Sequence, residues 1–208
     1  YLIPVNSNYG YTYSQQIILQ SEIATTGNIE KIKFYMVGGI SLASSNNWTV
    51  YLGHTSKTSF TSNTDWITTA GLTQVFSGTI AATPVAGWYE LTLATPFAYN
   101  NVDNLVVAVD ENAAGYDGSS NYVRVWTPTG TNRCIYYRSD STNPNPASIT
   151  QTGTRQNPIN QIQLVFPSTV LPGCATAHVP ADLATGVVKN PTLTWTADPN
   201  ASSYDVYF

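Results

Sequence analysis

The sequence contains little of what nucleic-acid-binding and membrane proteins use. Charged residues make up 10% of the 208 residues, against about a quarter in average soluble domains. The net charge is −4 and there is no run of Lys or Arg, so the basic surface that nucleic acids and anionic membranes require is missing. No apolar run approaches the roughly 20 residues of a membrane span. We therefore expect neither nucleic-acid binding nor membrane insertion.

Catalytic motifs are also missing. The chain has two histidines, His54 and His178, and contains no His-Glu-x-x-His motif, no Gly-x-Ser-x-Gly motif and no Gly-rich phosphate loop. No spacing of Cys and His indicates zinc. A glycosidase needs two carboxylates about 5–10 Å apart, and no pair stands out among the twelve Asp and Glu residues. The sequence therefore predicts a protein that is not an enzyme, with a carboxylate pair as the open alternative.

Cysteine is scarce, with Cys134 and Cys174 as its two occurrences. In a secreted chain the two residues could form a disulfide. They could equally be two unpaired small apolar residues, and the sequence leaves both alternatives open.

Aromatic and β-forming residues are abundant, with 14 Tyr and five Trp against one Met. In one run Ile32, Phe34 and Met36 alternate with Lys31, Lys33 and Tyr35, which is the pattern of a half-buried strand. The expected strands are Gln15–Ile23, Ile29–Val37, Trp48–Gly53, Leu72–Ile80, Trp88–Leu93, Asn104–Asp110, Asn121–Thr127, Arg133–Arg138 and Asn160–Phe166. With no helix beyond one turn in Asp65–Gly71, this predicts an all-β fold, an antiparallel jelly-roll β-sandwich.

A boundary is expected near Pro167. Residues 1–167 would form the sandwich and the Pro/Gly/Ser-rich stretch 168–174 a linker. Residues 175–208, with Trp195 and the Tyr204–Phe208 run, resemble the first strands of a fibronectin type III domain. We therefore expect a piece of a longer modular protein, whose partial second domain could self-associate by completing its open strands with a neighbour.

Acidic and amide side chains gather around one strongly apolar strand and the Gly-containing loop after it. Calcium takes six to eight oxygen ligands from such groups, so we expect a structural Ca²⁺ ion, with ordinary turn formation as the alternative. The candidate ligands are Asp103, Asp110, Glu111, Asn112, Asp117 and, from the first strands, Glu22.

Flat aromatic rings on strands can stack against sugars. Trp48 and Trp88 alternate with apolar neighbours, which favours the core. Trp66, Tyr116 and Trp126 are the expected exposed rings and the candidate ligand-binding residues.

Several segments resemble one family. Tyr11–Ile17 and Ser21–Ile23 are similar to the opening strands of jelly-roll modules in large secreted Bacteroidetes proteins, and Asn104–Asn112 to another strand of the same modules. Tyr136–Asp140 and Ile162–Phe166 fit the closing strands. The modules include the adhesin domains of gingipains and cargo of the type IX secretion system.

We expect the chain to attach to a glycan or a protein on a surface. The resemblance does not imply a ligand, but it implies a secreted or cell-surface adhesion module, often calcium-stabilised. It also implies a candidate O-glycosylation site at Ser141, because Asp140–Thr142 fits the short acceptor pattern of that group. Two alternatives stay open: a structural subunit of an extracellular fibre or array, and an accessory domain of a secreted peptidase or glycosidase.

Overall fold

The computed structural model describes residues 3–118, 122–167, 173–201 and 203–205, and almost all regular structure in them is β-strand. The chain divides into two compact units, residues 1–167 and 168–208. The elements of the first unit are β1 (Tyr11–Ile18), α1 (Gln20–Ile23), β2 (Gly27–Met36), β3 (Asn47–Thr55), η1 (Thr69–Gly71), β4 (Thr73–Thr79), β5 (Gly87–Tyr99), β6 (Asn104–Glu111), β7 (Val125–Trp126), β8 (Cys134–Ser139), η2 (Pro146–Ser148), β9 (Thr154–Gln156), β10 (Ile159–Asn160) and β11 (Ile162–Val165).

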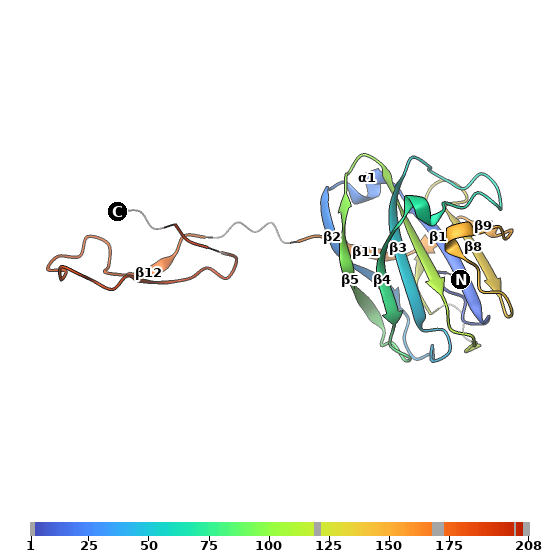
Figure 1. Ribbon diagram of the computed structural model, residues 1–208, viewed down its shortest axis with the longest axis horizontal. Coiled ribbons are helices and arrows are strands. Elements are labelled where there is room, and N and C mark those ends of the chain that lie inside the picture. Colours follow the sequence, from blue (N-terminus) through green and yellow to red (C-terminus); the bar gives the residue numbers. More distant parts are fainter. Residues whose placement is uncertain (1–2, 119–121, 168–172, 202, 206–208) are drawn as a thin grey trace. The chain divides into compact units, whose positions relative to one another are not determined.

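Two antiparallel sheets form the first unit (Figure 1). One has six strands in the order β4-β3-β6-β1-β8-β9, and the other has three in the order β11-β2-β5. A short β10-β7 pair continues the smaller layer through a bridge between Met36 and Val123. The chain crosses repeatedly between the two layers, as in a β-sandwich, and the jelly-roll topology stays a prediction. The expected all-β antiparallel sandwich is confirmed.

The core lies between the sheets and follows from alternation along the strands. On β2, Ile32, Phe34 and Met36 are buried, whereas Lys31, Lys33 and Tyr35 face outward. These side chains belong to a large apolar cluster to which β3 and β6 also contribute.

A second apolar layer covers the outer face of the six-stranded sheet. Tyr13, Ile17 and Ala108 from that face pack with Phe60 and Trp66 from the long connection between β3 and β4. Strand β6 is therefore buried on both faces, which explains its unbroken Leu105–Val109 run.

Some expected strands are shorter than the sequence indicates. Strand β1 ends at Ile18, and the helical turn α1 follows, in which Leu19 N–H donates to Glu22 Oε2 at 2.8 Å. The expected strand Asn160–Phe166 is split between β10 and β11, and of Asn121–Thr127 the described part has β7 alone.

The second unit contains a two-stranded antiparallel sheet of β12 (Thr176–Val179) and β13 (Thr194–Thr196). Its side chains are mostly exposed. Its likeness to fibronectin type III stays a prediction. Among the described residues of both units, no helix is long and apolar enough to cross a membrane.

Candidate functional site

Two carboxyl groups are buried side by side in the chain at the end of β6. Asp110 is 4% exposed and Glu111 is fully buried. Since neighbouring residues of a strand point to opposite faces, Glu111 faces the core beside Thr12 and Trp48, its partners on β1 and β3. Asp110 faces the outer layer, where Tyr13 is its partner on β1.

The Glu111 side chain has an incomplete set of partners. Ala113 N–H donates to Glu111 Oε1 at 2.7 Å, but Glu111 Oε2 is buried without a hydrogen-bond partner among the described residues. Burial raises the pKa of Glu111 to about 8, and the charges of Asp110 and Asp117 add to the shift. A buried carboxyl group at this position therefore resists ionisation unless a cation accompanies it.

Other polar groups converge on Glu111 from two loops. Asn6 N–H donates to Thr12 Oγ1 at 3.2 Å, and Trp48 Nε1 donates to Ser45 O at 2.9 Å, so both loops adjoin the strand partners of Glu111. Asn6 Nδ2 and Ser45 Oγ are also buried without partners in the described structure. This group of polar side chains around Glu111 is called the β6-end cluster below.

Asp117 ties the following loop to the β6-end cluster. Its backbone N–H donates to Ser7 O at 2.7 Å, and its two carboxylate oxygens each lie 3.1 Å from Ser44 N. The Asp117 carboxylate is near enough to Glu111 for its charge to raise the pKa of Glu111. Carboxylate oxygens are ligands that calcium prefers, and the uncompensated Glu111 Oε2 fits a cation. No group of three or more His, Cys, Asp or Glu side chains with metal-site geometry occurs among the described residues.

Asp110 has a separate environment on the outer face. Asn112 Nδ2 donates to Asp110 Oδ2 at 3.1 Å, while Oδ1 is buried without a partner in the described part of the chain. Burial raises the pKa of Asp110 to about 7. Asn143 Nδ2 donates to Asn112 Oδ1 at 2.9 Å, so Asn112 links Asp110 to the loop after β8 and not to the β6-end cluster.

The expectation that Asp103 and Glu22 join this cluster is wrong. Asp103 precedes the first residue of β6, about 23 Å of extended chain from Asp110, and it accepts a hydrogen bond from Asn100 Nδ2 at 2.8 Å. Glu22 forms an ion pair with the buried Arg133. Burial alone would raise the pKa of Glu22, but the hydrogen bonds from Arg133 and from Leu19 N–H lower it.

The expected exposed rings differ in their exposure. Trp66 is 9% exposed, so the expectation that it faces solvent is wrong. Its indole packs on Tyr13 with ring centroids 5.5 Å apart, and Nε1 donates to Gln151 O at 2.8 Å. Tyr116 and Trp126 are exposed, and Trp126 lines a small pocket of about 160 Å³ with Ile18.

Trp88, expected in the core, is instead exposed, with 47% of its surface accessible. It lies opposite Tyr35 on the outer face of the three-stranded sheet, with ring centroids 5.3 Å apart and planes at 79°. Arg124 lies over the Tyr35 ring, 5.2 Å from its centroid. These three side chains form an exposed group, which we call the Trp88 platform.

Alternation contained the signal for this exposure. Trp88 has the same parity on β5 as Glu90 and Thr92, which are exposed, and the opposite parity to the buried Leu91 and Leu93. The sequence around Trp88 looks apolar as a whole because it includes Tyr89 and Leu91, so the outward position of Trp88 is seen only when alternate residues are considered separately.

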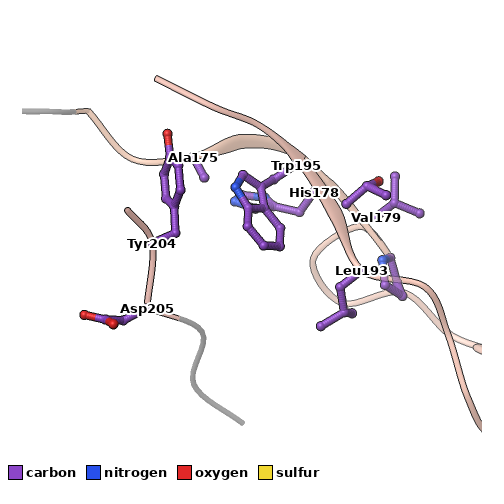
Figure 2. Close-up of a pocket in the computed structure, with 9 residues that line it drawn as sticks. Ala175, His178, Val179, Leu193, Trp195, Tyr204 and Asp205 are labelled. Atoms are coloured by element: carbon purple, nitrogen blue, oxygen red, sulfur yellow. The ribbon is translucent and has the colours of Figure 1, made fainter. Parts of the chain in front are cut away.

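The second unit has a larger pocket of about 300 Å³ lined by side chains of the β12–β13 hairpin and the segment after it (Figure 2). Trp195 and Tyr204 meet edge to face with centroids 5.8 Å apart, and Leu193 and Val179 complete an apolar wall. The lining side chains are largely exposed, as on a sheet face without a covering layer.

The remaining sequence candidates lie apart from these groups. Ser141 is exposed on the loop after β8, and nothing in the structure tests its glycosylation. Cys134 and Cys174 are free thiols, one buried in the first unit and one exposed in the second. Burial raises the pKa of the Cys134 thiol, so little thiolate forms and Cys134 is a poor nucleophile. His54 packs between the rings of Phe97 and Tyr99.

Comparison with protein-family models, with curated proteins and with solved structures found no match.

Proposed function

We propose that the first unit is a non-catalytic, secreted or cell-surface binding module of an adhesion protein, and that it binds a glycan through the Trp88 platform. The observation that carries the proposal is an exposed indole held edge to face against Tyr35 on the outer face of a sheet. Single exposed apolar residues are common on proteins, but here the guanidinium of Arg124 also lies over the Tyr35 ring.

The platform suits a sugar because it is preorganised. Tyr35 lies in the middle strand of its sheet, and the backbone of Arg124 is fixed on both sides, since Arg124 N–H donates to Tyr35 O at 2.8 Å and Gln161 N–H donates to Arg124 O at 2.9 Å. Binding therefore orders few side chains, which lowers its entropic cost. Gln163 is exposed on the same face opposite Lys33, the next outward position after Tyr35, and supplies a hydrogen-bonding group near the rings.

A glycan array probed with residues 1–208 tests the proposal. We expect bound glycans, and at least a tenfold loss of affinity for them in the Trp88→Ala variant, since stacking on an exposed ring contributes about 1–3 kcal/mol in comparable cases. Tyr116→Ala is the matched control, because that ring is exposed on a loop outside the platform. Glycan binding that survives Trp88→Ala, or an array without a bound glycan, would contradict the proposal.

We also propose that the module takes a structural Ca²⁺ ion at the β6-end cluster, with Glu111 and Asp117 as carboxylate ligands. The supporting observations are the buried Glu111 Oε2, which has no hydrogen-bond partner among the described residues, and the nearby charge of Asp117, which raises the pKa of Glu111. The ion would compensate the charge that burial otherwise disfavours and would hold the loops to the sheet.

Chelation tests the calcium proposal. A ligand present at 100 times its dissociation constant stabilises the native state by about 2.7 kcal/mol, so we expect chelator to lower the melting temperature by several degrees. Glu111→Gln should remove this difference, whereas Asp103→Asn, at the other end of β6, should retain it. An unchanged melting temperature, or a shift that Glu111→Gln leaves intact, would speak against calcium at this cluster.

A structural subunit of a fibre or array is the second candidate function. The exposed apolar wall of Val179, Leu193 and Trp195 in the second unit favours it. Sedimentation over a wide concentration range should then show self-association that Trp195→Ser weakens, and a monomer throughout would eliminate this candidate.

A further inference from the structure

The sheet face around the Trp88 platform has a positive net charge, whereas the chain as a whole has a negative one. The chain carries eight Lys and Arg residues and a net charge of −4. Three of those eight, Lys31, Lys33 and Arg124, lie on the outer face of the three-stranded sheet or at its edge. Glu90 and Glu30 are the acidic residues of β2 and β5, so this face is net positive on an acidic protein.

Arg124 is the cation nearest the rings, and its charge has no acidic partner. It forms no ion pair with any described carboxylate, whereas Arg133 is committed to Glu22 and to Ile17 O. The Arg124 guanidinium lies over the Tyr35 ring, and its N–H groups match the paired oxygens of a carboxylate or a sulfate.

Lys31 and Lys33 continue the positive charge along β2. Both ammonium groups share one carboxylate, with Nζ to oxygen distances of 2.7 Å and 2.9 Å to Glu90. Glu90 lies on the surface, where solvent screens ion pairs of this kind, so an incoming acid can take its place at little cost. Same-face positions on a strand are about 7 Å apart, so a linear polymer lying along β2 would pass Tyr35, Lys33 and Lys31 in turn.

We propose, on the basis of the proposed function, that the glycan bound by the Trp88 platform is an anionic polysaccharide. One sugar ring stacks on Trp88, whose ring Tyr35 holds edge to face, and an acidic group of the same chain pairs with Arg124. Further acidic groups along the polymer exchange with Glu90 at Lys33 and Lys31. Carboxylated and sulfated sugars share this chemistry, and the test below separates them.

Affinity electrophoresis of residues 1–208 tests the inference in gels containing polygalacturonate, chondroitin sulfate or a neutral mixed-linkage glucan. We expect retardation by at least one anionic polymer and little by the glucan. Trp88→Ala and Arg124→Gln should each weaken binding to that polymer about tenfold or more, as expected for loss of a charge-assisted hydrogen bond. Retardation by polygalacturonate alone identifies carboxylate recognition, and retardation by chondroitin sulfate alone identifies sulfate recognition.

Arg138→Gln is the matched control, because Arg138 also stacks on a tyrosine, 4.5 Å from the Tyr9 ring centroid, but on the other sheet. If Arg138→Gln weakened binding to the anionic polymer as much as Arg124→Gln does, binding would depend on overall charge and not on a specific site, and the inference would be overturned. Binding to the neutral glucan that depends on Trp88 but not on Arg124 would overturn the anionic class and leave the proposed function standing. No binding to any polymer would overturn the anionic inference, and a positive glycan array would then still support the platform. Unchanged melting temperatures in the variants establish that each protein is folded.

Discussion

At the scale of single residues, the end of β6 buries two ionisable side chains, whose charged forms are unfavourable there. Asp110 and Glu111 are adjacent in the chain and buried on opposite faces of one strand, and each has one oxygen without a partner among the described residues. An ionised carboxylate in such a place costs several kcal/mol unless it is paired or bound to a cation. Both groups therefore bind a proton more tightly in the folded chain than in the unfolded one.

The stability of the calcium-free protein should consequently fall as pH rises. The ordinary pKa values of the two groups are 3.8 and 4.5, and burial raises them to about 7 and about 8. Their protonated forms stabilise the fold fully below about pH 4, and this stability is lost progressively up to about pH 8. One pKa unit corresponds to about 1.4 kcal/mol, so the expected loss is roughly 4 kcal/mol for each of the two groups.

Melting temperatures in chelator between pH 4 and pH 8 measure this effect. Asp110→Asn and Glu111→Gln should each flatten the profile, because an amide does not titrate. The exposed Asp182→Asn change in the second unit should leave it unaltered. A melting temperature that rises over the same interval would contradict the sign of both shifts.

At the scale of elements, alternation was sufficient to predict the strands but not the layer that covers them. The faces of β2 and the buried alternation of Trp48, Val50 and Leu52 are read directly from period two, and the structure confirms both. Trp66 lies in a connection without periodicity, so no pattern in the sequence shows that it packs on Tyr13. Asp103 and Asp110 are close in the sequence but far apart in space, because β6 runs between them and places them at opposite ends of the strand.

The contact between this covering layer and the sheet gives an element-scale prediction. A Cβ atom at Gly153 would lie 2.6 Å from Trp66 Cζ2 and 2.9 Å from Ile135 Cγ1. Gly153→Ala should therefore destabilise the fold by about 1–3 kcal/mol, the usual cost of overpacking. Gly71→Ala is the control, since the nearest atom there is Ile67 Cγ2 at 3.9 Å. Urea unfolding of both variants measures this difference in stability. Equal unfolding midpoints for Gly153→Ala and Gly71→Ala would show that the covering layer accommodates the extra methyl group without loss of stability.

At the scale of the whole molecule, the two units differ in how much core they contain. All three apolar clusters of buried residues belong to the first unit, which has both sheets and the covering layer. In the described second unit a single hairpin and its neighbouring segment expose their larger apolar side chains, including Trp195 and Leu193. The glycan and calcium proposals concern groups of the first unit, so they require that unit to be stable alone.

Residues 1–167 should therefore fold without residues 168–208 and retain the properties proposed here. We expect the shortened chain to melt within about 2 °C of the full chain, because a change of 1 kcal/mol shifts a domain of this size by about 2–4 °C and no buried cluster is lost. Its chelator response and its Trp88-dependent glycan binding should also be preserved, since Glu111, Asp117 and the platform lie within it. Calorimetry of the two chains under identical conditions measures the first expectation. A melting temperature lower by many degrees would show that the second unit stabilises the first, and the binding experiments would then have to be interpreted for the two units together.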